Sequence, residues 1–252
     1  MGQPGKWTKQ EWSLHLAADR CGTISHRPCA QGVWAIVLAE MKPFSRPIDA
    51  SKKKRPHQAH SCGKWQRLEV RDVASSPWLR VQEIDFATPA RPHGGVRWMV
   101  VRRKQAAIVA PRLADGRFLL VHQERPAVED TLWEFPAGQV DVPNADGEEI
   151  AATARRELEE ETGHRLPPGG GRLIPLGLFF SSAGFTDERG HLFLAESVEA
   201  LPDPQPLGEG SEVIHEVRKV TARELREMIA AGEVRDANTL ACFARLTALG
   251  LL

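Results

Sequence analysis

The residues best suited to chemistry lie at positions 147–163, which read GEEIAATARRELEEETG. On a helix, Glu157, Glu160 and Glu161 stand at positions i, i+3 and i+4, so their carboxylates share one face. Three like charges on one face repel, and a divalent cation would turn that repulsion into attraction. Mg²⁺ takes oxygen ligands and commonly shares them with substrate phosphates. The spacing therefore predicts a magnesium site, with Arg156 placed to pair with a carboxylate and hold it.

The same stretch should form a helix. It contains no internal Gly or Pro and is rich in Ala, Leu, Glu and Arg, which favour helices. Asp146 is a suitable N-cap with Glu149 three residues later, and Gly163 is a suitable residue to end the helix. An acidic helix can also be no more than a solvated face, so the neighbouring residues have to decide between the two interpretations.

The residues around the helix resemble the signature of the Nudix hydrolases. That signature is Gly, five residues, Glu, seven residues, then Arg-Glu-apolar-x-Glu-Glu-x-Gly and an apolar residue. Every position from Glu148 to Gly163 fits it at the right spacing, and so long a pattern rarely arises by chance. Nine residues separate Gly138 from Glu148, which we interpret as an insertion at about residues 142–145, and His164 takes the final apolar place. The insertion changes the length of the loop that carries the phosphates, but it removes no carboxylate of the signature.

The resemblance implies an α/β fold of the α+β kind, the Nudix α/β/α sandwich with a mixed sheet. It also implies hydrolysis that depends on Mg²⁺, with Mn²⁺ as an alternative. Arg156 would orient the carboxylates, while Glu134 and Gly138, in the segment leading to the helix, would contact the substrate; glycine allows close backbone approach. The implied metal ligands are Glu157, Glu160, Glu161 and the backbone carbonyl of Ala137.

Residues before the helix resemble the ADP-ribose pyrophosphatase branch of the family. Strands expected at 78–86 and 96–103 precede a Gln-x-Arg-Pro segment that contains Arg125. In that branch such strands support a homodimer with shared active sites, the arginine contacts substrate, and an aromatic residue stacks on adenine. Trp98 is the best match for the aromatic residue, although an ordinary buried strand residue is an equal alternative. Arg125 fits phosphate recognition better than a surface salt bridge, because its guanidinium offers a fork of donors.

A second segment suited to chemistry lies at 181–189 and reads SSAGFTDER. The same branch has Ser-Pro-Gly-Phe-Ser/Thr-x-Glu here, on a mobile loop that carries a glutamate into the active site. Glu188 is therefore the first candidate for the general base, ahead of Glu160, and a solvated loop acid is the alternative interpretation. Ala183 replaces the usual Pro, which predicts a floppier loop.

The remaining pattern completes a mixture of strands and helices. Residues 114–117 should form a hairpin turn in which Asp-Gly supplies the positive φ angles of a type I′ loop. Thr221 and Glu224 form a capping box at the start of a helix. The family resemblance covers roughly residues 78–250. The other expected elements are strands at 105–110, 118–121, 173–180, 191–195 and 213–220, and helices that end near residues 231 and 250.

Residues 1–64 differ from the rest of the chain, which we divide into a strand region at 65–104 and a Nudix domain at 105–252. Periodicity is weak in this N-terminal extension, which predicts little regular structure. The basic run at 51–55 could contact a polyanion, and a start codon assigned upstream of the true one would also explain the segment. A zinc site is a further alternative, although the spacings match no standard pair of half-sites; its residues would be Cys21, His26, Cys29, His57, His60 and Cys62.

Bulk composition excludes several classes of protein. The 252 residues carry 33 Lys and Arg against 33 Asp and Glu, so nothing global indicates nucleic acid or an anionic membrane as a partner. No apolar run approaches the roughly 20 residues that cross a bilayer, and the N-terminus lacks the apolar segment of a signal peptide. We therefore expect a cytoplasmic protein with a small nucleotide substrate and no membrane partner.

The sequence favours Mg²⁺-dependent hydrolysis of the diphosphate bond in ADP-ribose, or in a related nucleoside diphosphate sugar, to AMP and a sugar phosphate. The first alternative is a Nudix enzyme for another substrate: a damaged nucleoside triphosphate, a dinucleoside polyphosphate or capped RNA. The signature does not separate these, and the choice depends on the strands before the core and the loop at 181–189. A non-catalytic nucleotide sensor is the second alternative, disfavoured because every signature acid is present.

Overall fold

The computed structural model describes residues 64–142, 145–203, 207 and 212–252. The expected N-terminal extension, its zinc-site alternative and its basic run therefore lie outside the described residues. Within the described residues, no helix is long and apolar enough to cross a membrane. The elements in chain order are β1 (Gln66–Ser75), β2 (Leu79–Thr88), β3 (Arg91–Arg103), β4 (Ala106–Leu113), β5 (Phe118–Arg125), a 3₁₀ turn (Pro126–Val128), β6 (Asp130–Glu134), β7 (Ala137–Gln139), α1 (Gly147–Thr162), β8 (His164–Arg165), β9 (Arg172–Phe180), β10 (Arg189–Ala200), β11 (Ile214–Val220), α2 (Ala222–Ala231) and α3 (Ala237–Leu249).

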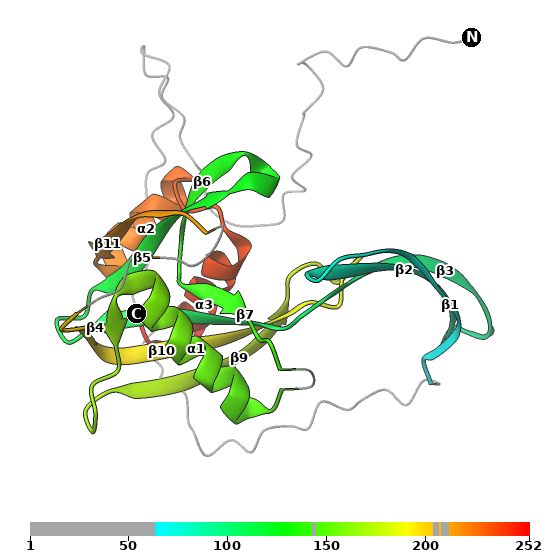
Figure 1. Ribbon diagram of the computed structural model, residues 1–252, viewed down its shortest axis with the longest axis horizontal. Helices are drawn as coiled ribbons and strands as arrows, with labels where there is room; N and C mark the ends of the chain where they lie inside the picture. Colours follow the sequence, from blue (N-terminus) through cyan, green and yellow to red (C-terminus); the bar gives the residue numbers. More distant parts are fainter. Residues whose placement is uncertain (1–63, 143–144, 204–206, 208–211) are drawn as a thin grey trace, which may run out of the picture. The chain divides into compact units, whose positions relative to one another are not determined.

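The larger of two sheets has the strand order β11-β5-β4-β10-β8, with β6 paired to β5, β7 to β4 and β9 to β10 (Figure 1). It is a mixed sheet, because β4 and β10 run parallel while the other pairs are antiparallel. Two of its connections carry or lead to candidate site residues. The β9–β10 connection carries Glu188, and β7 leads through the next loop into α1.

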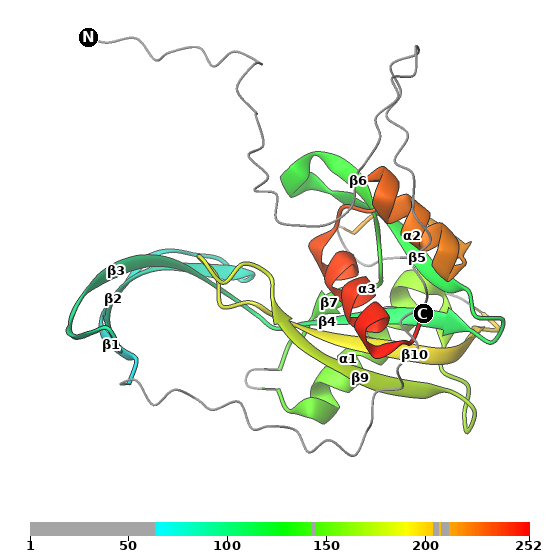
Figure 2. The same cartoon turned by 180° about the vertical axis from the view of Figure 1, so that it is seen from behind.

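Helices cover both faces of this sheet, and alternation along the strands decides which residue faces which helix. Ile108 of β4 belongs to the core cluster that contains residues of α2 and α3, such as Leu225 and Leu246. Its neighbour Val109 belongs to the other cluster, with Leu158 of α1. Figures 1 and 2 show α1 on one side of the sheet and α3 on the other. The predicted α/β/α sandwich with a mixed sheet is confirmed.

The smaller sheet contains β1, β2 and β3 in that order, all antiparallel (Figure 1). β2 and β3 overlap the two strands expected from the sequence. β1 lies in the strand region expected at 65–104 but was not predicted as a separate strand, and every one of its ten residues is exposed.

The turn between β4 and β5 differs from the expected type I′ loop. The N–H of Leu113 donates to the carbonyl of Arg117 at 2.8 Å, and the N–H of Gly116 donates to the carbonyl of Leu113 at 3.0 Å. Gly116 has a φ of 87°, whereas Asp115 is not among the described residues with positive φ. The loop therefore has one left-handed residue instead of two. The Asp115 carboxylate accepts a hydrogen bond from the N–H of Arg117 at 3.1 Å, which stabilises this geometry locally.

Candidate active site

Helix α1 is held at both ends and along one side. The Asp146 side chain accepts hydrogen bonds from the N–H groups of Glu148 and Glu149, and the Glu149 carboxylate accepts one from the N–H of Asp146 at 2.8 Å. Gly163 ends the helix with a φ of 64°, so the predicted capping is confirmed at both ends. Ile150, Ala154 and Leu158 pack against the sheet, which fixes the direction of the remaining faces of the helix.

Two of the three clustered acids are buried. Glu157 is 5% exposed and Glu161 is 1% exposed. One oxygen of Glu161, Oε2, accepts a hydrogen bond from the N–H of Ala137 at 3.0 Å. The other, Oε1, is buried and has no hydrogen-bond partner among the described residues. A buried acceptor left unpaired costs about 1–3 kcal/mol, so stability does not explain this arrangement.

Burial also changes the acidity of the cluster. It raises the pKa of Glu157 to about 7, with the negative charges of Glu160 and Glu212 acting in the same direction and Arg156 opposing them. Burial likewise raises the pKa of Glu161 well above its usual value, and the neighbouring Glu157 adds to this. A bound cation would favour the charged forms and reverse both effects.

The side chains around Arg156 offer oxygen ligands of the kind that a hard divalent cation takes. The Arg156 guanidinium donates to both Glu157 and Glu160, which is the carboxylate pairing predicted from the sequence. No three His, Cys, Asp or Glu side chains of the described chain converge into a closed ligand set. The donor set nevertheless fits Mg²⁺, because it consists of carboxylate oxygens and includes the unpaired Oε1 of Glu161.

Gly138 of β7 packs directly against the Glu157 carboxylate. A Cβ at this position would lie 1.8 Å from Oε1 of Glu157, far inside the van der Waals contact distance. The backbone and the carboxylate can approach so closely only because glycine lacks a side chain.

A cavity of about 770 Å³ opens beside these acids. Seven of the residues expected in the site from the sequence line it together: Arg125, Ala137, Gly138, Arg156, Glu157, Glu160 and Glu188. Glu161 is not a lining residue, and it contacts this wall through the N–H of Ala137.

Two expected substrate-binding residues do not line this cavity. Glu134 is buried and forms a two-pronged ion pair with Arg125, at 2.9 Å from Nε to Oε1 and 2.6 Å from Nη2 to Oε2. Trp98 is about half exposed, and its Nε1 donates to the carbonyl of Gly184 at 2.6 Å. In its own chain Trp98 borders a separate, smaller cavity that also includes Phe185.

The loop that carries Glu188 is fastened to β3 at several points, although Ala183 stands where a proline would stiffen it. The N–H of Val101 donates to the carbonyl of Phe185 at 2.7 Å, and the hydroxyl of Thr186 donates to the carbonyl of Val101 at 2.8 Å. The Arg102 guanidinium pairs with Asp187 at 2.6 Å. These contacts join the two sheets at the edge of the cavity.

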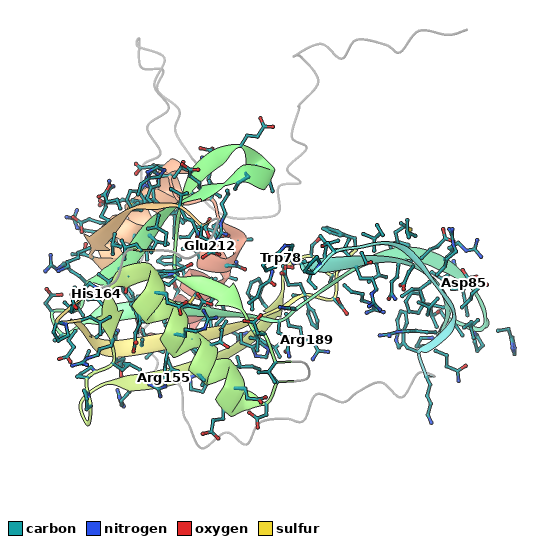
Figure 3. The ribbon with its side chains drawn as sticks, viewed as in Figure 1. Trp78, Asp85, Arg155, His164, Arg189 and Glu212 are labelled. Atoms are coloured by element: carbon teal, nitrogen blue, oxygen red, sulfur yellow. The ribbon has the colours of Figure 1, made fainter. Side chains whose placement is uncertain are left out.

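Sequence reasoning did not find several other residues that line the cavity. Trp78 lies in the β1–β2 turn and is 64% exposed, a large fraction for an indole ring beside a polar cavity. Figure 3 labels Trp78 at the end of the three-stranded sheet and Glu212 before β11. An exposed Trp after Ser-Pro was the only local signal, since the others depend on long-range contacts. The residues missed are Trp78, Arg103, Ala106, Gln139, Asp141, Glu212, Asp236 and Asn238.

Comparison with known proteins gives consistent matches. The model of the NUDIX domain matches residues 101–242. An "ADP-ribose pyrophosphatase" of Bacillus subtilis (strain 168) is 36% identical over 140 residues, which cover 56% of this chain and 70% of that protein. A "CMP-5'-(N-acetyl-N-hydroxy-3-aminopropyl)phosphonate hydrolase" of Streptomyces rubellomurinus is 31% identical, over 63% of this chain and 78% of that one. The solved structure of an "ADP compounds hydrolase" shares the fold, with a TM-score of 0.59 and 18% identity over 76% of this chain and 99% of that chain.

Proposed function

The chain belongs to the NUDIX family, and from this premise we propose that it hydrolyses the diphosphate bond of ADP-ribose, or of a related nucleoside diphosphate sugar, to AMP and a sugar phosphate. The observation that carries the proposal is the pair of buried acids, Glu157 and Glu161, beside a cavity that also contains arginines and an exposed tryptophan. Acids that hold a cation, arginines that bind phosphates and an indole that stacks on a base are the groups that such a substrate requires. Two relatives are named for nucleotide conjugates, one for ADP-ribose and one for a phosphonate joined to CMP.

Mg²⁺, or Mn²⁺ in its place, would be held by the carboxylates of Glu157, Glu160 and Glu161 and by the backbone carbonyl of Ala137. When bound there, a divalent cation neutralises charge on the diphosphate and lowers the pKa of water. Arg156 would keep Glu157 and Glu160 in position, because it already donates to both.

The hydrolytic step needs a base beside the diphosphate. The oxygen of a water molecule forms a bond to one phosphorus, and the bond from that phosphorus to the bridging oxygen breaks. Glu188, whose side chain borders the cavity, accepts the proton of the water, and Glu160 is the second candidate. With ADP-ribose as substrate the products are AMP and ribose 5-phosphate.

The substrate's other groups have partners around the cavity. Arg125 and Arg103 would bind phosphate oxygens through the guanidinium N–H groups that do not face Glu134 and Glu188. Trp78 would stack on the nucleobase, since it is exposed and borders the cavity. Trp98 lies outside the cavity of its own chain. In a homodimer with shared active sites, it would stack on the base bound in the cavity of the other subunit.

We assign the homodimer to the three-stranded sheet. β1 is an edge strand with all of its residues exposed, and an exposed edge with apolar side chains is a ready surface for association. The exposed apolar side chains of this sheet include Leu68, Val70, Val73 and Met99, and Trp65 precedes β1. Sedimentation equilibrium tests this assignment, and a monomer at micromolar concentration would contradict it. The proposed compartment is the cytoplasm.

Substrate identity is tested by product release with Mg²⁺ from a panel of ADP-ribose, ADP-glucose, GDP-mannose, NADH, diadenosine polyphosphates and 8-oxo-dGTP. Preference for ADP-ribose, lost on adding EDTA, supports the proposal. Preference for a triphosphate would support the proposed metal chemistry but contradict the proposed substrate. Binding without turnover of any compound would favour a nucleotide sensor.

The metal assignment is tested with Glu161→Gln, which keeps the shape of the side chain and removes its charge. Turnover should be abolished. Glu159→Gln is the matched control, because Glu159 is an exposed residue of the same helix and should leave the rate unchanged. Full activity of Glu161→Gln would refute the metal site.

A further inference from the structure

The Glu188 carboxylate is held from two sides. Nε of Arg103 lies 2.8 Å from Oε1 of Glu188, and the hydroxyl of Ser181 donates to Oε2 at 2.7 Å. The Glu188 side chain is 20% exposed, so it remains open to the cavity while both of its oxygens have protein partners.

The strands on either side place these residues opposite one another. Phe180, at the end of β9, pairs with Arg189, at the start of β10. Ser181 and Glu188 are the next residues out along the two strands, so the hairpin itself brings the hydroxyl to the carboxylate. The N–H of Glu188 also donates to the hydroxyl of Thr186 at 3.2 Å. The backbone at Glu188 is therefore fixed without the help of its own side chain.

We propose that Ser181 and Arg103 are positioning residues that clamp the Glu188 carboxylate in the orientation needed to accept a proton from the attacking water. This inference rests on the proposed function, in which Glu188 is the base. A glutamate side chain has three torsions, and without partners it would sample several rotamers. The ion pair with Arg103 and the charge-assisted hydrogen bond from Ser181 hold its two oxygens and select one of these rotamers. Each carboxylate oxygen has a second acceptor site, so the clamp leaves room for the proton.

The two clamp residues differ in their relation to the substrate. Arg103 lines the cavity, whereas Ser181 does not. Nε of Arg103 faces Glu188, which leaves the two terminal nitrogens of the fork for a phosphate of the substrate. Replacing Arg103 would therefore change binding and positioning together. Replacing Ser181 removes only the hydrogen bond to Glu188, which makes Ser181 the better residue to test.

The experiment measures kcat and KM for ADP-ribose with saturating Mg²⁺ in the full-length protein. Ser181→Ala should lower kcat about tenfold, the effect of one lost charge-assisted hydrogen bond, with KM and the melting temperature unchanged. Ser181→Thr keeps the hydroxyl and should restore the rate. The matched control is Ser182→Ala, because Ser182 accepts hydrogen bonds from Phe185 and Thr186 through its backbone carbonyl, and its rate should equal that of the wild type.

A double-mutant cycle separates positioning from a merely structural role. If Ser181 acts through Glu188, Ser181→Ala should have no further effect on kcat in a Glu188→Gln background. Equal losses in the two backgrounds, or a wild-type rate for Ser181→Ala, would overturn the clamp while leaving the proposed function in place. A wild-type protein that hydrolyses no compound of the panel would instead refute the proposed function and the clamp with it. If another compound of the panel is preferred, the same cycle is measured on that compound.

Discussion

In the absence of divalent cations, the free energy of unfolding should fall as the pH rises. Glu157 is the reason, because burial raises its pKa from the usual 4.5 to about 7, and Glu161 is shifted in the same direction. Between those two pH values the folded state binds more protons than the unfolded state. The free energy of unfolding must then fall with increasing pH, so the contribution of the protonated acid is present at low pH and lost through pH 7.

The size of this effect follows from the pKa of Glu157. A shift from 4.5 to about 7 corresponds to about 3.4 kcal/mol when complete, at about 1.4 kcal/mol per unit. About 2.5 kcal/mol of this falls between about pH 5 and about pH 8. The Glu157 side chain is only 7% exposed, so screening by solvent removes little of it. Mg²⁺ at about 100 times its Kd would add back about 2.7 kcal/mol.

The assay is urea unfolding at pH 5 and pH 8, with EDTA or with Mg²⁺, for the wild type, Glu157→Gln and the control Glu159→Gln. The wild type and the control should lose stability between the two pH values in EDTA, and the loss should shrink in Glu157→Gln. His191 acts in the opposite sense, because burial lowers its pKa, but it is common to all three proteins and cancels in the comparison. A wild-type stability in EDTA that is flat or rises with pH would refute the reasoning. So would an equal loss in Glu157→Gln.

Three further predictions concern the walls of the cavity. Gly138→Ala should lower kcat at least about a hundredfold by displacing the Glu157 carboxylate, whereas Gly147→Ala, with nothing within 4 Å of the added Cβ, should be fully active; equal rates would exclude the close contact. Trp78→Ala should raise KM for ADP-ribose about tenfold or more with kcat unchanged, because base stacking contributes about 1–3 kcal/mol, and an unchanged KM would remove Trp78 from the site. Gln139→Met should raise the free energy of unfolding by about 1 kcal/mol, since Oε1 of Gln139 is buried and has no hydrogen-bond partner among the described residues, and a loss of stability in urea would show that the amide is satisfied.

Helix α1 could be predicted from the sequence because its determinants are local. The spacing of Glu157, Glu160 and Glu161, the capping by Asp146 and the glycine after the last turn all lie within one helix length. Such features depend on backbone geometry that is the same in every helix. The spacing did not predict that two of these acids are buried, because the sequence pattern of an acidic helix face is the same whether its side chains are buried or exposed.

The aromatic residue beside the cavity could not be chosen from the sequence. Trp78 immediately precedes β2 and Trp98 lies within β3, and both have the apolar ring and polar edge of a base stacker. β2 and β3 are antiparallel and pair Leu79 with Arg103, which brings the residue before β2 to the end of β3. Trp98 lies five residues earlier on β3, against the loop at Gly184. Only the pairing register separates the two, and register is set by contacts between strands.

The clamp on Glu188 shows the same dependence on register at closer range. Ser181 and Glu188 are seven positions apart, and this separation alone does not predict a contact between them. The pairing of Phe180 with Arg189 brings them together, because successive residues of two antiparallel strands stay opposite each other. A shift of one residue would turn one of the two side chains to the other face of the hairpin. The chemistry attributed to Glu188 therefore depends on the length of the β9–β10 loop as much as on the carboxylate itself.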